Sequence, residues 1–382
     1  MKSPLRIPEG ARQILKAVAG EALKRKLPVY LVGGAVRDFV MGRRTRDLDF
    51  TVDGNPKPLV DFCAKLVKVE PIPFDSFGTW RLVGSKRWEI DFATSRSESY
   101  PFPASLPVVK TPVPIEEDLK RRDFTINAMA LKLSGEISSE ILDPFGGLKD
   151  IQSRKIRVLH DVSFEDDPTR VFRAARYAGR FNFSCVPEIE KLARRSLKAG
   201  YPQKLSRHRV LSEILKILSE ENPHSALVLL QKWGYLDLLG FRLKVPSLSE
   251  WRDLDAYTRL GFWAFSLGSQ AENFIASLPL EARASKEILT AIKVSRAQES
   301  PRNFLPDLSQ NILRAVYPKK AKFSFEALKI SGADLIGQGI NPGPEMGNIL
   351  EKAARLQWRG QMSSRAEELR WLKTRISKKG KK

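Results

Sequence analysis

The sequence is poor in cysteine, with only Cys63 and Cys185 among its 382 residues. Their separation is not the short spacing of a metal site, and two thiols so far apart do not form a disulfide framework. Chains of this kind are typical of reducing compartments. A cytoplasmic location is therefore expected.

Long apolar runs are also missing. The most apolar stretch, residues 225–241, is interrupted by Lys232 and Asp237, so it predicts a core segment rather than a membrane span. The first residues, Met1 to Pro4, do not have the apolar stretch of a signal peptide. No membrane association is expected from these features.

Acidic residues are few relative to basic ones. The chain has 44 Asp and Glu against 65 Lys and Arg, which gives a formal net charge of +21. Such an excess favours a polyanionic partner, either a nucleic acid or an anionic membrane surface. Because no basic amphipathic helix or lipid anchor accompanies the charge, nucleic acid is the favoured partner.

A hydrophobic content of 42% indicates a folded chain, and the length indicates two to four domains. Helical and strand periodicities alternate in the first hundred residues, which predicts an α+β head with a small sheet. The expected helices are 8–26, 35–41 and 59–69, and the expected strands are 27–32, 47–52, 79–83 and 87–93.

The sequence pattern changes from residue 95 onward. Residues 95–114 are rich in Pro and Ser and predict a long loop, and 155–159 predict a last strand. From Pro168 onward the pattern is almost wholly helical, with breaks near 245–247 and 300–301 and no internal repeat. We expect an elongated all-α part after the head, with a disordered basic end at 378–382.

Asp47 and Asp49 lie on the second predicted strand. Side chains on a strand alternate between faces, so both carboxylates point to one face, and Leu48 and Phe50 point to the other, towards the core. Two such carboxylates can share hard cations such as Mg²⁺ and support two-metal nucleotidyl transfer. The alternative is an exposed strand edge with two solvated acids.

A third carboxylate would complete this site. On the strand 87–93, Trp88, Ile90 and Phe92 share one face, whereas Glu89 and Asp91 share the other. We favour Asp91 as the third catalytic carboxylate, with Glu89 as its competitor and a plain surface acid as the alternative.

Gly33 and Gly34 separate the first strand from a helix. Glycines allow the backbone to approach phosphate closely, and a helix N-terminus favours anions. Arg37, one turn into the helix, could then donate to a triphosphate. An ordinary glycine turn is the alternative.

Residues 120–128 bring Arg121, Arg122, Asp123 and Asn127 together. Two guanidinium groups, a carboxylate and an amide in one short segment could bind a triphosphate and the hydroxyls of a ribose. The alternative is a charged turn before an apolar segment.

Asp167 precedes Pro168, which is a good helix start. Asp167 and Arg170 also lie three residues apart on one helical face, where they offer acceptors and donors to the edge of cytosine or adenine. Asp167 could be both cap and base reader only if each of its oxygens does one job. Arg173 and Arg176 continue a basic stripe along the helix.

These motifs together resemble those of the class II tRNA nucleotidyltransferases, a family that includes bacterial poly(A) polymerases. The resemblance rests on residues 33–38, 46–50, 121–128, 143–150, 156–159 and 166–170. It implies that Asp123 reads the ribose 2′-hydroxyl, that Arg122 and Asn127 help to bind the nucleotide, and that Asp167 and Arg170 select the base.

Residues 205–210 with Glu213 are similar to the family's next helical motif. Arg209 matches that motif and is included among the nucleotide-binding residues. His208 stands where the family usually has Glu, so we expect it to be structural.

The resemblance implies addition of CMP, AMP or both to the 3′ end of tRNA, with CTP and ATP as substrates, Mg²⁺ as cofactor and no obligatory protein partner. It implies four domains: a nucleotidyltransferase head, a helical neck, a helical body and a tail that binds tRNA. Their expected ranges are 1–160, 161–220, 221–300 and 301–382. Helices at 346–358 and 364–376 resemble those of the tail.

Two other functions stay open. A poly(A) polymerase of the same family usually carries a Gly-Arg-Arg-Phe-like segment where this chain has residues 77–81, and a non-catalytic RNA-binding protein would not need the intact acids. The sequence also leaves CCA, CC and A addition open, although residues 96–114 could be the loop that helps the family switch bases. No phosphohydrolase domain is expected, because the only His-Asp pair, His160–Asp161, lies at the junction of head and neck.

Overall fold

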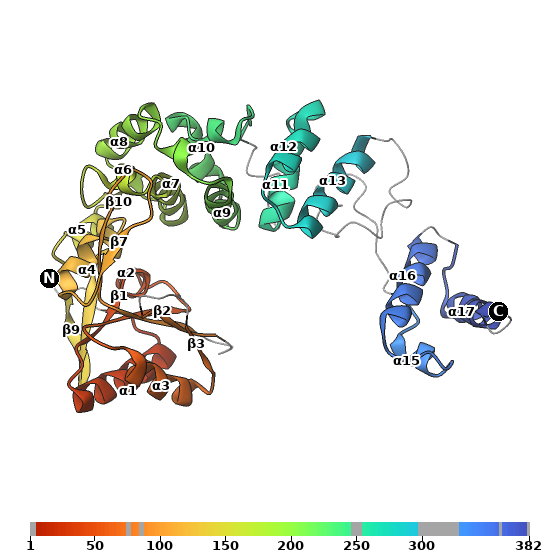
Figure 1. The fold of residues 1–382 in the computed structure, drawn as a ribbon, viewed down its shortest axis with the longest axis horizontal. Coiled ribbons are helices and arrows are strands. Elements are labelled where there is room, and N and C mark those ends of the chain that lie inside the picture. Colours follow the sequence, from red (N-terminus) through yellow and green to blue (C-terminus); the bar gives the residue numbers. More distant parts are fainter. Residues whose placement is uncertain are drawn as a thin grey trace. The chain divides into compact units, whose positions relative to one another are not determined.

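The structure is a computed structural model that describes residues 5–73, 78–83, 88–245, 254–296, 328–358 and 361–379. It divides into two compact units (Figure 1). The first unit comprises Met1–Glu213 and Glu220–Leu238, and the second comprises Ile214–Ser219 and Leu239–Lys382. The four domain ranges expected from the sequence stay predictions.

The first unit contains the predicted head. Its seven-stranded sheet has the order β3-β4-β5-β2-β1-β8-β9, and only β2 and β5 pair in parallel. The strands are β1 (Val29–Val32), β2 (Asp47–Val52), β3 (Pro71–Pro73), β4 (Trp80–Leu82), β5 (Glu89–Thr94), β8 (Ala130–Ser134) and β9 (Glu136–Leu142). The helices and strands predicted up to residue 94 are all present in the predicted order, but the structure adds the short strand β3, which the sequence did not predict. Residues 84–87, in the predicted turn between β4 and β5, lie outside the described residues.

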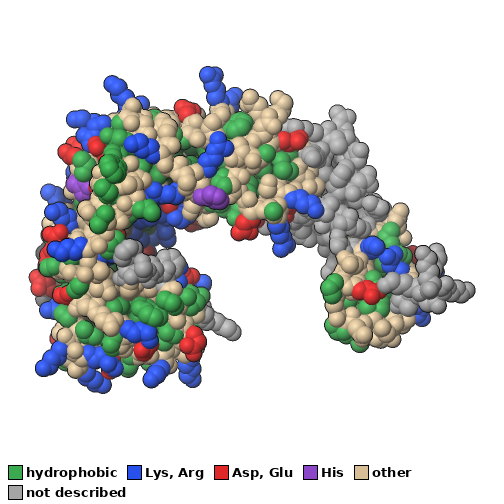
Figure 2. Space-filling model, in the orientation of Figure 1, with side chains coloured by type: hydrophobic (Ala, Val, Ile, Leu, Met, Phe, Trp, Pro, Cys, Tyr) green, Lys and Arg blue, Asp and Glu red, His purple; other side chains and the backbone are tan. Residues whose placement is uncertain are grey.

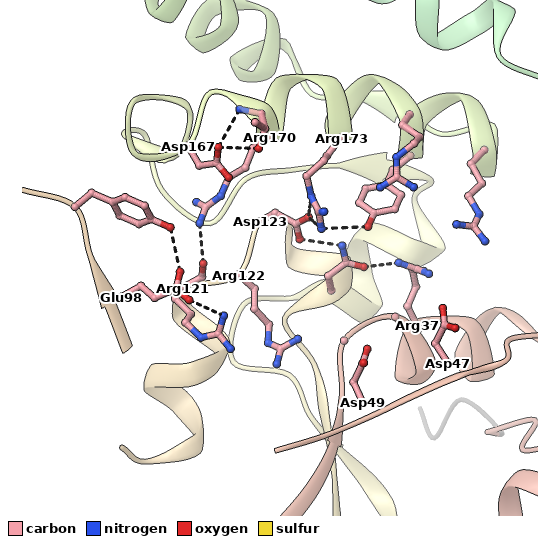
Figure 3. A pocket seen from close by; sticks show the side chains of 18 residues that line it. Arg37, Asp47, Asp49, Glu98, Arg121, Arg122, Asp123, Asp167, Arg170 and Arg173 are labelled. Carbon is pink, nitrogen blue, oxygen red and sulfur yellow. Dashed lines mark hydrogen bonds and ion pairs between the residues drawn. The ribbon is translucent and has the colours of Figure 1, made fainter. Parts of the chain in front are cut away.

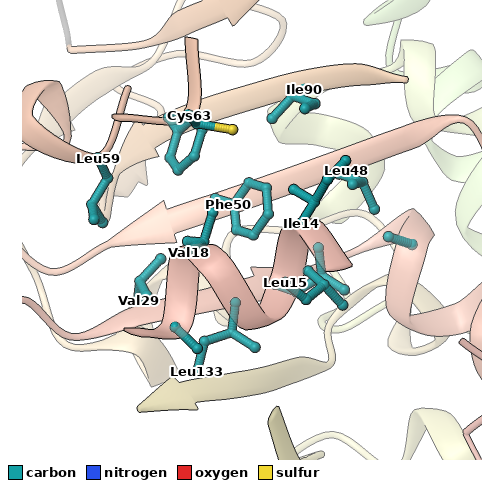
Figure 4. Packing of buried hydrophobic residues seen from close by; sticks show 14 of the residues in the cluster. Ile14, Leu15, Val18, Val29, Leu48, Phe50, Leu59, Cys63, Ile90 and Leu133 are labelled. Atoms are coloured by element: carbon teal, nitrogen blue, oxygen red, sulfur yellow. The ribbon is translucent and has the colours of Figure 1, made fainter. Parts of the chain in front are cut away.

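Helices α1 (Glu9–Arg25) and α3 (Lys57–Val67) cover one face of this sheet. Figure 4 shows the helical side chains packed against β2 and β5. Leu48 and Phe50 of β2 are almost fully buried there, and the Phe50 ring stacks on Phe92 with centroids 4.6 Å apart. Because strand side chains alternate, Asp47 and Asp49 are directed to the opposite face.

Residues 95–114 correct the prediction of a long loop. They contain a two-stranded antiparallel hairpin of β6 (Ser97–Ser99) and β7 (Val108–Lys110). The ladder has only three residue pairs. Pro101, Pro103 and Pro107 lie in the connection between its strands, and Pro112 and Pro114 follow β7. Helix α4 (Ile115–Lys120) follows directly.

The predicted last strand is also different. Residues 155–159 yield only β10 (Lys155–Ile156), which pairs in parallel with β11 (Ser184–Cys185) in a separate sheet. The region after Pro168 is therefore not entirely helical. Asn182 ends the preceding helix in a left-handed conformation, and the chain then runs extended beside β10.

Helix α7 (Thr169–Phe181) is central to the first unit, and ten of its thirteen residues are buried. It packs on α10 (His224–Trp233), and its Phe172 makes an edge contact with Tyr235 at 5.6 Å between centroids. The remaining helices of this unit are α2 (Gly34–Met41), α5 (Gly147–Gln152), α6 (Ser163–Asp166), α8 (Pro187–Lys198) and the first part of α9 (Arg207–Leu218).

The described part of the second unit is helical. Its helices outside α9 are α11 (Ala256–Phe265), α12 (Ala271–Ser277), α13 (Ala282–Arg296), α15 (Gly332–Ile336), α16 (Pro344–Trp358) and α17 (Arg365–Lys379). The two expected tail helices are confirmed as α16 and α17. Lys378 and Lys379 are helical rather than disordered, because α17 continues to Lys379; residues 380–382 lie outside the described part.

Some predictions fall on residues outside the described part of the chain. Residues 246–253 and 297–327, which include the expected breaks beyond residue 245, are not among those described. No helix in the described ranges is long and apolar enough to cross a membrane. Lys and Arg side chains are spread widely over the visible face of both units, as Figure 2 shows.

We expect Phe50→Ala to destabilise the head by about 3–5 kcal/mol, because it leaves a cavity between the sheet and its helices. Hydrogen exchange of the β2 and β5 amides would measure this loss. Phe102→Ala is the control, since Phe102 is 72% exposed and its truncation should change exchange little. Equal protection in the two variants would contradict this description of the core.

Candidate active site

A cavity of about 490 Å³ opens in the first unit, on the face of the sheet that α1 and α3 leave uncovered. It lies between β2, the start of α2, and α7 (Figure 3). The cavity brings together twelve of the residues that were predicted from the sequence. These are Gly33, Gly34, Arg37, Asp47, Asp49, Arg122, Asp123, Asn127, Asp167, Arg170, Arg173 and Arg176.

Asp47 and Asp49 lie on the sheet side of the cavity. Neither carboxylate makes a hydrogen bond or ion pair with any described residue, although Asp49 is only partly exposed. Burial, followed by the nearby charge of Glu89, raises the pKa of Asp47. The pKa of Asp49 is raised to about 6 by burial, against the lowering effect of Arg122.

This pair fits a divalent cation. Hard cations prefer carboxylate oxygens, and the raised pKa values reflect acids that are desolvated and close to other acids, without sufficient positive charge. Asp47 and Asp49 would hold the ion, and phosphate and water oxygens would complete its coordination.

The predicted third carboxylate is already bound. Asp91 lies opposite Asp49 in the parallel β2–β5 register, and Glu89 lies opposite Asp47. Arg81 binds Asp91 with both ends of its guanidinium, with Nε 2.9 Å from Oδ1 and Nη2 2.7 Å from Oδ2. Within the described ranges no group of three acidic, His or Cys side chains is placed to hold an ion. Asp91 therefore stays a predicted ligand that would have to leave Arg81.

Gly33 and Arg122 meet on the Asp49 side of the cavity. Gly33 has a φ of +69°, and a Cβ at this position would lie 2.7 Å from Nη1 of Arg122. Nη2 of Arg122 donates to Asp118 at 2.9 Å, whereas its buried Nε has no hydrogen-bond partner among the described residues. A guanidinium held beside bare backbone in this way suits a polyphosphate.

Arg37 is buried, and its donors are largely committed. Its guanidinium binds Asp38 at 2.9 Å and the side-chain oxygen of Asn127, and it lies 4.6 Å from the ring centroid of Phe181. Arg37 thus fixes Asn127 in the cavity and is less free to bind a ligand than the sequence suggested.

Asp123 forms the next link. Its Oδ1 accepts from the Phe124 amide and from Asn127, each at 2.9 Å, and its Oδ2 accepts from Nε of Arg173 at 2.8 Å. Burial by itself would raise the pKa of Asp123, but the pairing with Arg173 and the bond from Asn127 lower it to about 2. Arg173 also donates to Asp123 through Nη2, so the Asp123 carboxylate already accepts from four donors. A ribose hydroxyl would have to replace one of them.

Asp167 meets the condition for a residue with two jobs. Its Oδ1 accepts from the amide of Thr169, the first residue of α7, at 3.0 Å and from Arg209 at 2.8 Å, although the residue at the N-cap position is Pro168. Its Oδ2 has no hydrogen bond to any described residue. One oxygen is thus used by the fold and the other is left for a ligand, and Arg209 reaches the site through Asp167.

Arg170 is held at the same end of α7. It is 5% exposed, and it donates through Nη1 to Ser163 Oγ at 2.9 Å and through Nη2 to the carbonyl of Arg121 at 2.8 Å. These bonds fix the plane of the guanidinium beside Asp167. The predicted pair of acceptor and donor is therefore present in one place.

The sequence did not single out five other lining residues: Glu98, Tyr100, Thr169, Tyr177 and Arg180. Arg121, from the predicted segment 120–128, also lines the cavity. Glu98 and Tyr100 belong to the β6–β7 hairpin region, where the Tyr100 hydroxyl donates to Glu98 at 3.0 Å. The hairpin was hidden by its Pro and Ser content. Arg180 continues the stripe of Arg173 and Arg176 by one helical turn, and that spacing could have revealed it.

Comparisons with known proteins agree with this geometry. Residues 29–157 match the family described as "Poly A polymerase head domain". This match gives the class of the head, and the observed fold and acid pair agree with it. A CC-adding tRNA nucleotidyltransferase of Deinococcus radiodurans is 30% identical over 344 residues, which cover 88% of this chain and 87% of that protein. The chain therefore belongs to the class II tRNA nucleotidyltransferase family.

Other relatives are similar over part of their length. An A-adding tRNA nucleotidyltransferase of Aquifex aeolicus is 42% identical over 211 residues, 55% of this chain and 25% of that protein. One of Geobacter sulfurreducens is 29% identical, over 90% of this chain and 45% of that protein. The chain thus spans less than half the length of these two relatives.

Solved structures share the fold along the chain. A CCA-adding enzyme in an apo form has a TM-score of 0.65 at 26% identity and covers 97% of this chain and 96% of its own. The Thermotoga maritima CCA-adding enzyme complexed with tRNA has a TM-score of 0.62 at 26% identity, with 97% of each chain covered.

We expect Asp123→Asn to destabilise the protein at pH 7 by roughly 2–4 kcal/mol, because it removes a buried carboxylate charge that pairs with the partly exposed Arg173. The folded-state pKa of Asp123 lies below its ordinary value, so its contribution is present above about pH 4 and is lost as the pH falls towards 2. Urea unfolding at pH 7 and pH 3 would measure the difference from the wild type.

Exposed Asp161→Asn is the control for this series. The difference in the free energy of unfolding between the wild type and Asp123→Asn should be smaller at pH 3 than at pH 7. A difference that stays constant would show that Asp123 is not held ionised by Arg173.

Proposed function

We propose that this protein adds CMP, AMP or both from CTP and ATP to the 3′ end of tRNA. The observation that carries the proposal is the unpartnered pair Asp47 and Asp49, which shares one cavity with Arg122 and with the Asp167–Arg170 pair. The similar proteins are CC-adding, A-adding and CCA-adding enzymes, which supports this choice of reaction.

Different residues of the cavity bind different parts of the incoming nucleotide. The turn at Gly33 and Gly34, where Gly33 has no Cβ to block the approach, and the guanidinium of Arg122 bind the triphosphate, beside Asp49. Asp167 and Arg170 bind the edge of the base at the other end of the cavity. Because both are fixed by the fold, a base can be selected without a nucleic-acid template.

Asn127, which donates to Asp123, is the proposed ribose contact together with that residue. Arg37 and Arg173 are positioning residues, since each binds the side chains that hold Asn127 and Asp123 in place. A small shift of this network would displace the ribose relative to the acids and slow the reaction.

The proposed cofactor is Mg²⁺, held by Asp47 and Asp49. Bound there, it would lower the pKa of the attacking hydroxyl and neutralise charge on the triphosphate. The 3′-oxygen of the RNA forms a bond to the α-phosphorus, the bond from that phosphorus to pyrophosphate breaks, and the hydroxyl proton passes to water.

Addition of A alone is the second candidate. It is favoured by the A-adding relatives from Aquifex aeolicus and Geobacter sulfurreducens. Extension of tRNA that lacks its CCA end, and of tRNA that ends in CC, would separate the candidates when CTP and ATP are supplied singly and together. Long A tracts on any RNA would instead indicate a poly(A) polymerase, and no incorporation with Mg²⁺ would leave only an RNA-binding protein.

We expect Asp47→Ala to reduce nucleotide incorporation by roughly 1000-fold or more, because loss of a metal-binding carboxylate removes several kcal/mol of transition-state stabilisation. Binding of tRNA should persist. Single-turnover incorporation and equilibrium tRNA binding would measure the two effects. Asp53→Ala, an exposed acid just after β2, is the control, and a wild-type rate in Asp47→Ala would refute the metal assignment.

We expect Gly33→Ala to weaken binding of MgATP at least about tenfold, because a Cβ would force Arg122 away and the positive φ strains any other residue. Titration calorimetry with MgATP would measure the change. Gly20→Ala is the control, since Gly20 lies in helix α1 with open space around it. Equal affinity in the two variants would exclude the proposed phosphate cradle.

A further inference from the structure

The loop between α2 and β2 carries free positive charge. Arg43, Arg44 and Arg46 are all exposed, and none forms an ion pair with a described residue. The arginines inside the cavity differ: Arg37 and Arg122, for example, each bind a neighbouring acid. The loop therefore offers unneutralised guanidinium groups, which are the preferred ligands of phosphate.

The loop adjoins the cavity at its Asp47 end. Arg46 directly precedes Asp47, and the Arg43 guanidinium lies 5.3 Å from the ring centroid of Phe181. Arg180, which lines the cavity, lies 5.6 Å from the same centroid. The basic loop and the cavity thus share Phe181 as a common neighbour.

The backbone of the loop is fixed at both ends. The Arg43 amide donates to the carbonyl of Asp38 at 2.8 Å, and the carbonyl of Arg46 accepts from the Glu89 amide at 2.8 Å. The Asp47 amide donates to Thr45 Oγ1 at 3.1 Å. The arginines therefore project from an anchored segment, so that their distance from Asp47 is set by the fold.

The two acids face different surroundings. Arg122 and Asp47 lie on opposite sides of Asp49 in Figure 3, and Gly33 adjoins Arg122. In nucleotidyl transfer the attacking and leaving oxygens lie roughly in line on opposite sides of the phosphorus. If the triphosphate lies against Arg122 and Gly33, the RNA 3′ end approaches from the Asp47 side.

We propose that Arg44 and Arg46, together with Arg43, bind the phosphodiester backbone of the last nucleotides of the RNA primer. This inference rests on the proposed function, and it assigns a strand-binding site separate from the nucleotide site. Phosphate contacts orient a strand without reading its sequence, which is what a growing 3′ end requires.

The test compares two double variants that each remove two positive charges. Arg44→Ala/Arg46→Ala leaves Arg43 in place against Phe181, and Lys16→Ala/Lys65→Ala is the control. Lys16 and Lys65 are exposed on α1 and α3, which cover the other face of the sheet, and neither pairs with a described residue.

We expect the arginine variant to raise KM for tRNA about tenfold with little change in KM for ATP, whereas the lysine variant stays close to the wild type. Loss of two phosphate contacts should also reduce the slope of log affinity against log salt by about 1.4, at roughly 0.7 per contact for single strands. A change in KM for ATP alone, or equal effects of the two variants, would overturn the proposal.

A primer with neutral methylphosphonate linkages at its last two phosphodiesters places the contact at the 3′ end. The wild type should lose affinity for this primer, and the arginine variant should lose little more. If the arginine variant lost as much affinity for the neutral primer as the wild type does, so that the effects of the two changes added, the contact would lie elsewhere and the inference would be refuted. Because binding is measured without turnover, this result stands apart from the proposed function, which fails if the wild type extends no RNA.

Discussion

The ion pair between buried Asp123 and partly exposed Arg173 holds the site together. Asp123 follows α4 in the head and Arg173 lies on α7, so this pair joins two segments that both line the cavity. Asn127 and Arg37 extend the contact to Asp38 on α2, so one chain of polar side chains spans the cavity. Removing one member would leave a buried charge without its partner, which is costly in a region of low dielectric constant.

This constraint explains why so many polar side chains of the cavity are unavailable to a ligand. Most acceptors of Asp123 and most donors of Arg37 are used by the fold, and Asp167 uses one oxygen to accept from the Thr169 amide at the start of α7. Few groups have no partner among the described residues: both oxygens of Asp47 and of Asp49, and the second oxygen of Asp167. Gly33 adds the space that a Cβ would fill beside Arg122, although its own N–H and C=O are bonded to Met129 and Arg37. A cation, a base edge and a polyphosphate fit these openings in turn, and the anchored basic loop before Asp47 lies outside them.

Local sequence patterns were sufficient to predict the structure where a short repeat determines the face to which a side chain points. The alternation of β2 placed Leu48 and Phe50 in the core and Asp47 and Asp49 on the other face, and the structure has this arrangement. Patterns were insufficient where a feature depends on pairing between distant segments. The β6–β7 hairpin has three pairs among prolines, and β10 finds its partner only after α7 ends.

By itself, the sequence determined the order of elements in the head, the acid pair, the glycine turn and the family resemblance, because each is encoded within a few neighbouring residues. Tertiary structure decided which of these groups remain free. Arg81 takes Asp91, Arg173 takes Asp123 and Arg209 takes one oxygen of Asp167, through contacts between residues 10, 50 and 42 positions apart. No local period records such partners, since they depend on how β4, β5, α7 and α9 pack in space.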